Sequence, residues 1–175
     1  MKILTRGFGA SSGLIAIYIE HCPPMLEYKN LTEVQPLSLG EVAMINQASG
    51  NGWRKIFNVY AKILGQLEHS DHNYTNYDSW QSYRDECLLQ SHSQEALLFS
   101  VPDLSANQYR YHVIAGRTYA KRLFRDHIFT NSLVWLDEEF AVDNNHRVVV
   151  CPFLDYRQLS NIKINKLCDI LRGLN

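Results

Sequence analysis

Four short apolar runs constrain the fold of this chain more than any other feature. They occupy residues 14–19, 96–101, 111–115 and 148–151, and polar residues are rare inside each of them. A run of this length without polar alternation is typical of a β-strand that is covered on both faces. The first three runs are followed by residues that stop strands, at Pro23, Pro102 and Gly116.

Apolar residues at helical spacing fill much of the chain between and after these runs. The clearest stripe, which we assign to the core, consists of Trp53, Ile56, Phe57, Tyr60, Leu64 and Leu67. On the other side of that helix, Arg54 and Lys55 form a solvated pair unless Arg54 reaches the edge where the strands end. Further helices are predicted near residues 83–90, at 119–128 and at 164–171, and a short strand at 132–136. Ser38 and Glu41 form a capping box that predicts another short helix, which ends at residues 50–52.

Strands that alternate with helices predict a three-layer α/β/α sandwich with a mainly parallel central sheet. The chain has 175 residues, of which 46% are hydrophobic, and this is enough apolar material for one core. We therefore expect a single α/β domain, residues 1–175.

Charge and cysteine content remove several functional classes. The formal net charge of −1 gives no general attraction to nucleic acid, although a local basic patch stays open. Four scattered cysteines without a CxxC pair indicate reduced thiols and a cytoplasmic protein, and we expect neither a metal nor a cofactor. The first apolar run is too short to cross a membrane, so no membrane association is expected.

A candidate site follows from the sheet itself. The carboxyl ends of parallel strands meet at one edge, which should gather the loops at residues 20–24, 100–103, 116–118 and 151–161. In a functional interpretation, Glu20 or His21 orients a water molecule. Arg117 and Arg157 hold an anionic group such as a phosphate. The remaining ligand-binding candidates lie in the last loop and are Asp155, Tyr156 and Asn161. Tyr156 would stack on a planar ligand, and Asn161 would offer an amide.

Each candidate also has a structural explanation. Asp155 can pair with Arg157 or with backbone, and Ser160 or Asn161 can cap the last helix. Gly116 can present helix amides to a phosphate or can serve only the turn geometry.

Cysteine and histidine suggest a third kind of chemistry. Cys151 and His21 both lie near strand ends, as a thiol or histidine catalyst would, but cysteine is also a common buried hydrophobe. His69 and His72 lie in a polar loop without the further ligands that zinc needs.

The order of the strand-end motifs resembles that of the uracil-DNA glycosylase superfamily. The similar segments are residues 19–24 (Ile-Glu-His-Cys-Pro-Pro), 97–100 (Leu-Leu-Phe-Ser), 113–120 and 150–155. The resemblance implies the topology of that superfamily and a role of the first loop in activating water. It also implies a histidine in the last loop, where this chain has Cys151, so the resemblance is not extended to glycosylase turnover. Residues 50–57 and 155–161 make the chain look like a member of a small uncharacterised bacterial family.

Three functions remain after these arguments. The first is binding of a nucleobase, a nucleotide or a nucleic-acid end at the strand-end edge, which the motif order favours. The second is a non-catalytic interaction or structural protein, which the missing acid/base set favours. The third is a small hydrolase that uses His21 or Cys151. The oligomeric state and whether the chain is an enzyme stay open.

Overall fold

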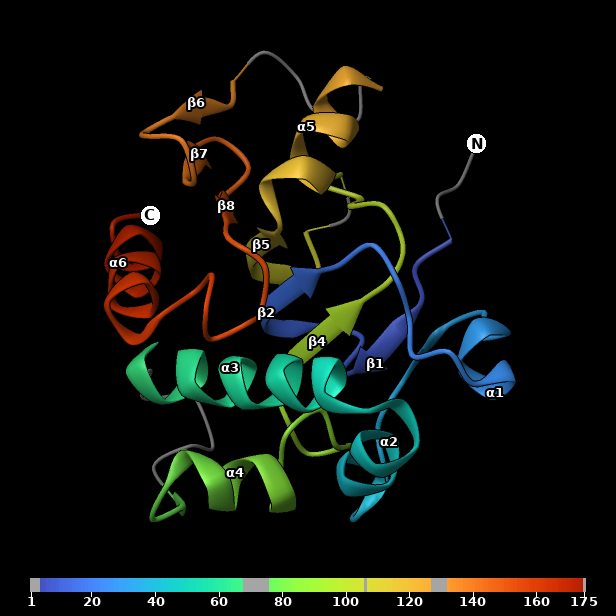
Figure 1. Ribbon diagram of the computed structural model, residues 1–175. Helices are drawn as coiled ribbons and strands as arrows, with labels where there is room; N and C mark the ends of the chain where they lie inside the picture. The colour runs from blue at the N-terminus through green and yellow to red at the C-terminus, as the bar shows by residue number, and fades with distance from the viewer. Residues whose placement is uncertain (1–3, 68–75, 106, 127–131, 175) are drawn as a thin grey trace.

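One mixed sheet with helices on both faces forms the protein (Figure 1). A computed structural model describes residues 4–67, 76–105, 107–126 and 132–174. The described residues form eight strands, in the spatial order β3-β1-β4-β2-β5-β8-β7-β6. Their bounds are β1 (Gly7–Gly9), β2 (Gly13–Tyr18), β3 (Val34–Gln35), β4 (Glu95–Leu98), β5 (Tyr109–Ala115), β6 (Val134–Trp135), β7 (Ala141–Asp143) and β8 (Val148–Cys151). The helices are α1 (Leu26–Lys29), α2 (Glu41–Ser49), α3 (Asn51–Leu67), α4 (Trp80–Glu86), α5 (Arg117–Arg125) and α6 (Asn161–Arg172).

The sheet is parallel in its centre, and among the outer pairs of described strands only β3 with β1 is parallel. The four apolar runs form β2, β4, β5 and β8, which are parallel neighbours in the order β4-β2-β5-β8. Outside them, β1 runs antiparallel to β4, and β7 and β6 add an antiparallel hairpin beside β8. The expectation of a mainly parallel sheet is therefore correct for the core strands and wrong for the flanks.

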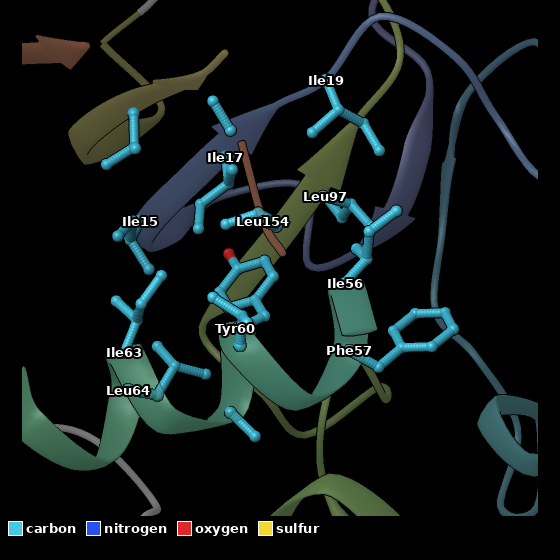
Figure 2. Close-up of a cluster of buried hydrophobic side chains, with 14 of the residues drawn as sticks. Ile15, Ile17, Ile19, Ile56, Phe57, Tyr60, Ile63, Leu64, Leu97 and Leu154 are labelled. Atoms are coloured by element: carbon cyan, nitrogen blue, oxygen red, sulfur yellow. The ribbon is translucent and has the colours of Figure 1, made fainter. Parts of the chain in front are cut away.

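Side chains alternate between two hydrophobic clusters along each central strand. On one face, Ile15 and Ile17 of β2 and the following Ile19 point toward α3, as Figure 2 shows. On the other face, Ala16 and Tyr18 belong to the cluster that α5 covers. Because both faces are covered, both sets of alternating residues are apolar, which explains the continuous runs in the sequence.

The stripe predicted from residue 53 onward is the buried side of α3. From this stripe, Ile56, Phe57, Tyr60 and Leu64 belong to the cluster drawn in Figure 2, and α3 adds Ile63 to it. The Tyr60 hydroxyl donates to the carbonyl of Ala96 at 2.7 Å, which satisfies the one polar atom that this stripe buries against β4. No helix in the described part of the chain is both long and apolar enough to cross a bilayer.

Candidate functional site

A cleft of about 730 Å³ opens where β2, β5 and β8 end. We call it the strand-end cleft. Its walls come from the loop after β2, the first turn of α5, the loop after β8, the first turn of α3 and Glu139 before β7. Parallel strands deliver the first three of these segments to the same edge, as the sequence predicts.

Aromatic side chains form much of the wall. Trp53 lines the cleft from α3, and its ring packs against that of Phe57, with centroids 5.7 Å apart. Phe153 follows β8 and lies beside Gly116, where an added Cβ would be 3.8 Å from its ring. Gly116 has a φ of +105°, which lets the chain turn from β5 directly into α5. The turn therefore places Tyr119 of α5 on the same wall.

The two carboxylates that line the cleft are both paired with cations. Glu20 forms an ion pair with Arg122 of α5 and also lies 3.8 Å from Nε2 of His21. Glu139 binds Nζ of Lys163, on the first turn of α6, at 2.8 Å. Within the described ranges, no group of three or more histidine, cysteine, aspartate or glutamate side chains is arranged to hold a metal ion.

Two arginines give the cleft its positive charge. Arg117 donates only a long hydrogen bond, 3.4 Å, to the carbonyl of Glu138, and the guanidinium of Arg157 lies 5.7 Å from the Tyr156 ring centroid. Neither guanidinium forms a salt bridge with a carboxylate of the described residues. A guanidinium without a carboxylate partner, at the rim of an apolar cleft, is suited to an anionic group of a ligand.

Comparison with known proteins places the chain in one family. The model of a family of unknown function, DUF6942, matches residues 6–172. The chain belongs to the DUF6942 family. No curated protein and no solved structure matches it. Every element that lines the cleft of this DUF6942 chain lies inside the matched residues.

Four of the residues predicted from the DUF6942 sequence line the cleft, and they are Glu20, His21, Arg117 and Arg157. Asp155 lies in the loop behind them, where its carboxylate binds Lys55 at 3.5 Å and accepts the backbone N–H of Arg157 at 2.9 Å. Tyr156 is 51% exposed and lines a separate groove beside α3. Asn161 is an exposed first residue of α6, and the Ser160 side chain makes no capping hydrogen bond.

Cys151 is placed where it cannot act as a nucleophile. It ends β8, its side chain belongs to the core cluster under α3, and it is 0% exposed. Burial raises the pKa of its thiol well above the ordinary value, which disfavours the reactive thiolate. The hydrolase hypothesis is therefore wrong for Cys151, whereas the His21 side chain is 84% exposed at the cleft.

One predicted loop does not reach the cleft. Asp103 from the loop at residues 100–103 instead lines a hollow of about 10 Å³ next to Tyr18 and His112, on the face of the sheet that α5 covers. The histidine pair predicted at residues 69 and 72 lies outside the described residues.

Sequence reasoning missed the aromatic wall and the second ion pair. Trp53 was assigned to the core alone, although its place in the first turn of α3 also brings it to the strand-end edge. Phe153 could have been predicted, because it follows β8 by two residues and therefore lies at the strand-end edge. Glu139 and Lys163 could not be paired, because β7 was not recognised as a strand.

Proposed function

We propose that the strand-end cleft binds a nucleotide, with its base against the aromatic wall and its phosphate at the two arginines. One observation carries this proposal. Arg117 and Arg157 present guanidinium groups without salt-bridge partners among the described residues, at a cleft whose wall is otherwise largely apolar. Planar bases stack on aromatic side chains, and guanidinium groups bind phosphate through paired hydrogen bonds.

The size and backbone of the cleft support the same ligand class. Its volume of about 730 Å³ falls in the range of small-molecule and cofactor sites. Arg117, Thr118 and Tyr119 form the first turn of α5 and line the cleft, and the amides of a first helical turn have no partner within the helix. They add donors next to the Arg117 guanidinium.

We further propose a topological relationship to the uracil-DNA glycosylase superfamily. Its support is that the four strands carrying the motif order are β2, β4, β5 and β8, the parallel neighbours of the sheet. Base excision is not part of this proposal. Glu20 is paired with Arg122, and the buried Cys151 stands where the resemblance requires a charge-stabilising histidine.

Calorimetric titration tests the proposal. Nucleoside monophosphates should bind saturably, and free nucleobases or inorganic phosphate more weakly, since each supplies one half of the contacts. Replacing Arg117 and Arg157 by alanine should weaken monophosphate binding by about tenfold or more, because hydrogen bonds to charged groups are lost. The control is Arg125→Ala, which removes an exposed arginine of α5 that pairs with Asp126 outside the cleft.

A short uracil-containing DNA should be included in the same experiment. Release of free base would make the protein a glycosylase, contrary to the arrangement of Glu20 and Cys151. The absence of saturable binding for every nucleotide and nucleobase would refute the proposed function.

A further inference from the structure

We infer that the solvent-facing side of α3 is a binding track for single-stranded nucleic acid that leads into the strand-end cleft. A groove of about 320 Å³ runs along this side, and we call it the α3 groove. Its polar lining consists of Asn51, Arg54, Lys55, Asn58, Lys62 and Tyr156. The inference rests on the proposed function, because it adds the strand to which the bound nucleotide would belong.

The solvent-facing side of α3 carries cations and no acidic residue. The 17 residues of this helix include no aspartate or glutamate, and nine of them are buried against the core. The three cations, Arg54, Lys55 and Lys62, therefore all lie on the one side that is not buried, with Asn58 between them. A helix surface that serves only to be solvated usually carries both signs of charge in i,i+4 pairs, and this one does not.

Aromatic side chains flanked by cations lie at two places along this side. The Tyr156 ring is 5.3 Å from Nζ of Lys55 and 5.7 Å from the Arg157 guanidinium carbon. The Trp80 ring is 5.1 Å from Nζ of Lys62 and 5.4 Å from the Arg84 guanidinium carbon. Trp80 starts α4, which lies along α3 in Figure 1. The Tyr156 ring is exposed, whereas the Trp80 ring is partly buried against the core. Aromatic rings beside cations are the combination with which proteins hold single strands, through base stacking and phosphate contacts.

The local charge is opposite to that of the whole chain. Five cations lie on or beside the groove, and two carboxylates pair with them, Asp85 with Arg84 and Asp155 with Lys55. Among the described residues, these five cations and two carboxylates leave an excess of three positive charges, on a chain whose net charge is −1. A polyanion is therefore attracted to this side of the molecule rather than to its surface in general.

The groove and the cleft meet at two consecutive residues. Tyr156 lines the groove and Arg157 lines the cleft. A strand whose terminal nucleotide occupies the cleft therefore passes over Tyr156 onto α3. From Asn51 to Lys62 the helix extends about 16 Å, enough for contact with a few successive nucleotides.

Binding of a fluorescein-labelled oligothymidylate of about ten nucleotides, measured by anisotropy over a range of salt concentrations, tests this inference. The variant is Arg54→Ala with Lys62→Ala. We expect about tenfold weaker binding at low salt, and a slope of log affinity against log salt that is smaller by about 1.4, because two phosphate contacts are lost. Tyr156→Leu should also weaken binding by about tenfold, through lost stacking. The matched control, Lys121→Ala with Arg125→Ala, removes two cations from α5 across the sheet and should change the affinity less than about twofold.

The outcomes separate the track from the cleft. Arg54→Ala with Lys62→Ala should leave the affinity for a nucleoside monophosphate unchanged, since neither residue lines the cleft. Monophosphate binding without oligonucleotide binding, or an equal loss in variant and control, would overturn the track and leave the proposed function in place. If heparin bound as tightly as the oligonucleotide, the inference would also be overturned, because the surface would then bind any polyanion. Oligonucleotide binding that depends on Arg54 and Lys62, without monophosphate binding, would support the track and refute the nucleotide cleft.

Discussion

Two of the polar side chains that the sheet buries, His112 of β5 and Glu95 of β4, are each hydrogen-bonded to a tyrosine. The Tyr18 hydroxyl and Nδ1 of His112 are 2.8 Å apart, on the face that α5 covers. On the other face, both carboxylate oxygens of Glu95 accept from the Tyr83 hydroxyl at 2.8 Å, and one of them also accepts the Leu89 backbone N–H at 3.2 Å. Because an unpaired buried polar group is costly, these pairs favour one arrangement of the segments that they join.

His112 should make the stability of the protein depend on pH. Burial, the largest cause, lowers the pKa of His112 to about 4, below its ordinary value of 6.5. Between these values the unfolded chain binds the proton and the folded chain does not, so stability falls as pH falls from about 6.5 toward about 4. The free energy of unfolding should fall between pH 7.5 and pH 4.5 in the wild type, and this fall should be smaller by about 2 kcal/mol in His112→Gln. Urea unfolding at the two pH values measures both. The exposed His21, changed to glutamine, serves as control and should retain the wild-type loss. An equal loss in the wild type and His112→Gln would contradict the prediction.

At the residue scale, the sequence predicted the polar part of the site better than the apolar part. Glu20, His21, Arg117 and Arg157 were found because polar residues just after an apolar run stand out. Cys151 is at the end of its strand, as the sequence predicts, but the sequence does not show whether the side chain of a strand's last residue faces the core or the cleft. The aromatic wall was missed because an apolar residue on a helix is equally compatible with the core and with a cleft beside the core.

At the element scale, the long elements were predictable, and among the strands of two or three residues only β6 was, inside the strand predicted at residues 132–136. Central strands and α3 bury enough consecutive apolar residues to show their period, whereas β1, β3 and β7 have only two or three residues each. The capping box before α2 is half formed: Glu41 accepts the Ser38 backbone N–H at 2.9 Å, but Gly40, with a φ of +85°, precedes the helix. β1 is least recognisable, because two of its three residues are glycines that are needed for contact rather than for strand propensity.

Gly9 should tolerate no side chain. It pairs with Ala96 of β4, has a φ of +107°, and an added Cβ would lie 2.3 Å from the carbonyl oxygen of Glu95. We expect Gly9→Ala to lower the free energy of unfolding by about 3 kcal/mol, because neither backbone can move without disturbing the sheet. Gly52→Ala in α3 is the matched control, since an added Cβ meets nothing within 4 Å, and it should be neutral or stabilising by up to about 1 kcal/mol. Denaturant unfolding measures both, and a Gly9→Ala protein as stable as Gly52→Ala would exclude the close approach of β1 to β4.

At the scale of the whole molecule, one sheet supports two hydrophobic clusters. Each central strand contributes alternate residues to both, so neither cluster can form without the strands that build the other. The strand-end cleft uses both sides as well, with Trp53 from α3 on one face and Tyr119 from α5 on the other. The site therefore depends on the integrity of the entire sheet, and the single domain expected from the sequence predicts one cooperative unfolding transition.

Leu123 and Phe124 of α5 provide the test of this cooperativity. Leu123 is 3% exposed in the smaller cluster, whereas its neighbour Phe124 is 41% exposed. We expect Leu123→Ala to lower the free energy of unfolding by about 2–4 kcal/mol, because a buried side chain is lost. Phe124→Ala should lower it by less than about 1 kcal/mol. Both proteins carry Trp135→Phe, because Trp135 lies beside Lys121 of α5 and the fluorescence should come from Trp53 and Trp80, on the α3 side. If the sheet is one unit, Leu123→Ala lowers the urea midpoint equally when followed by far-ultraviolet circular dichroism and by this fluorescence. Separate midpoints for the two signals would show instead that α5 and its cluster unfold independently, and the cleft would then lose the α5 wall before its α3 wall.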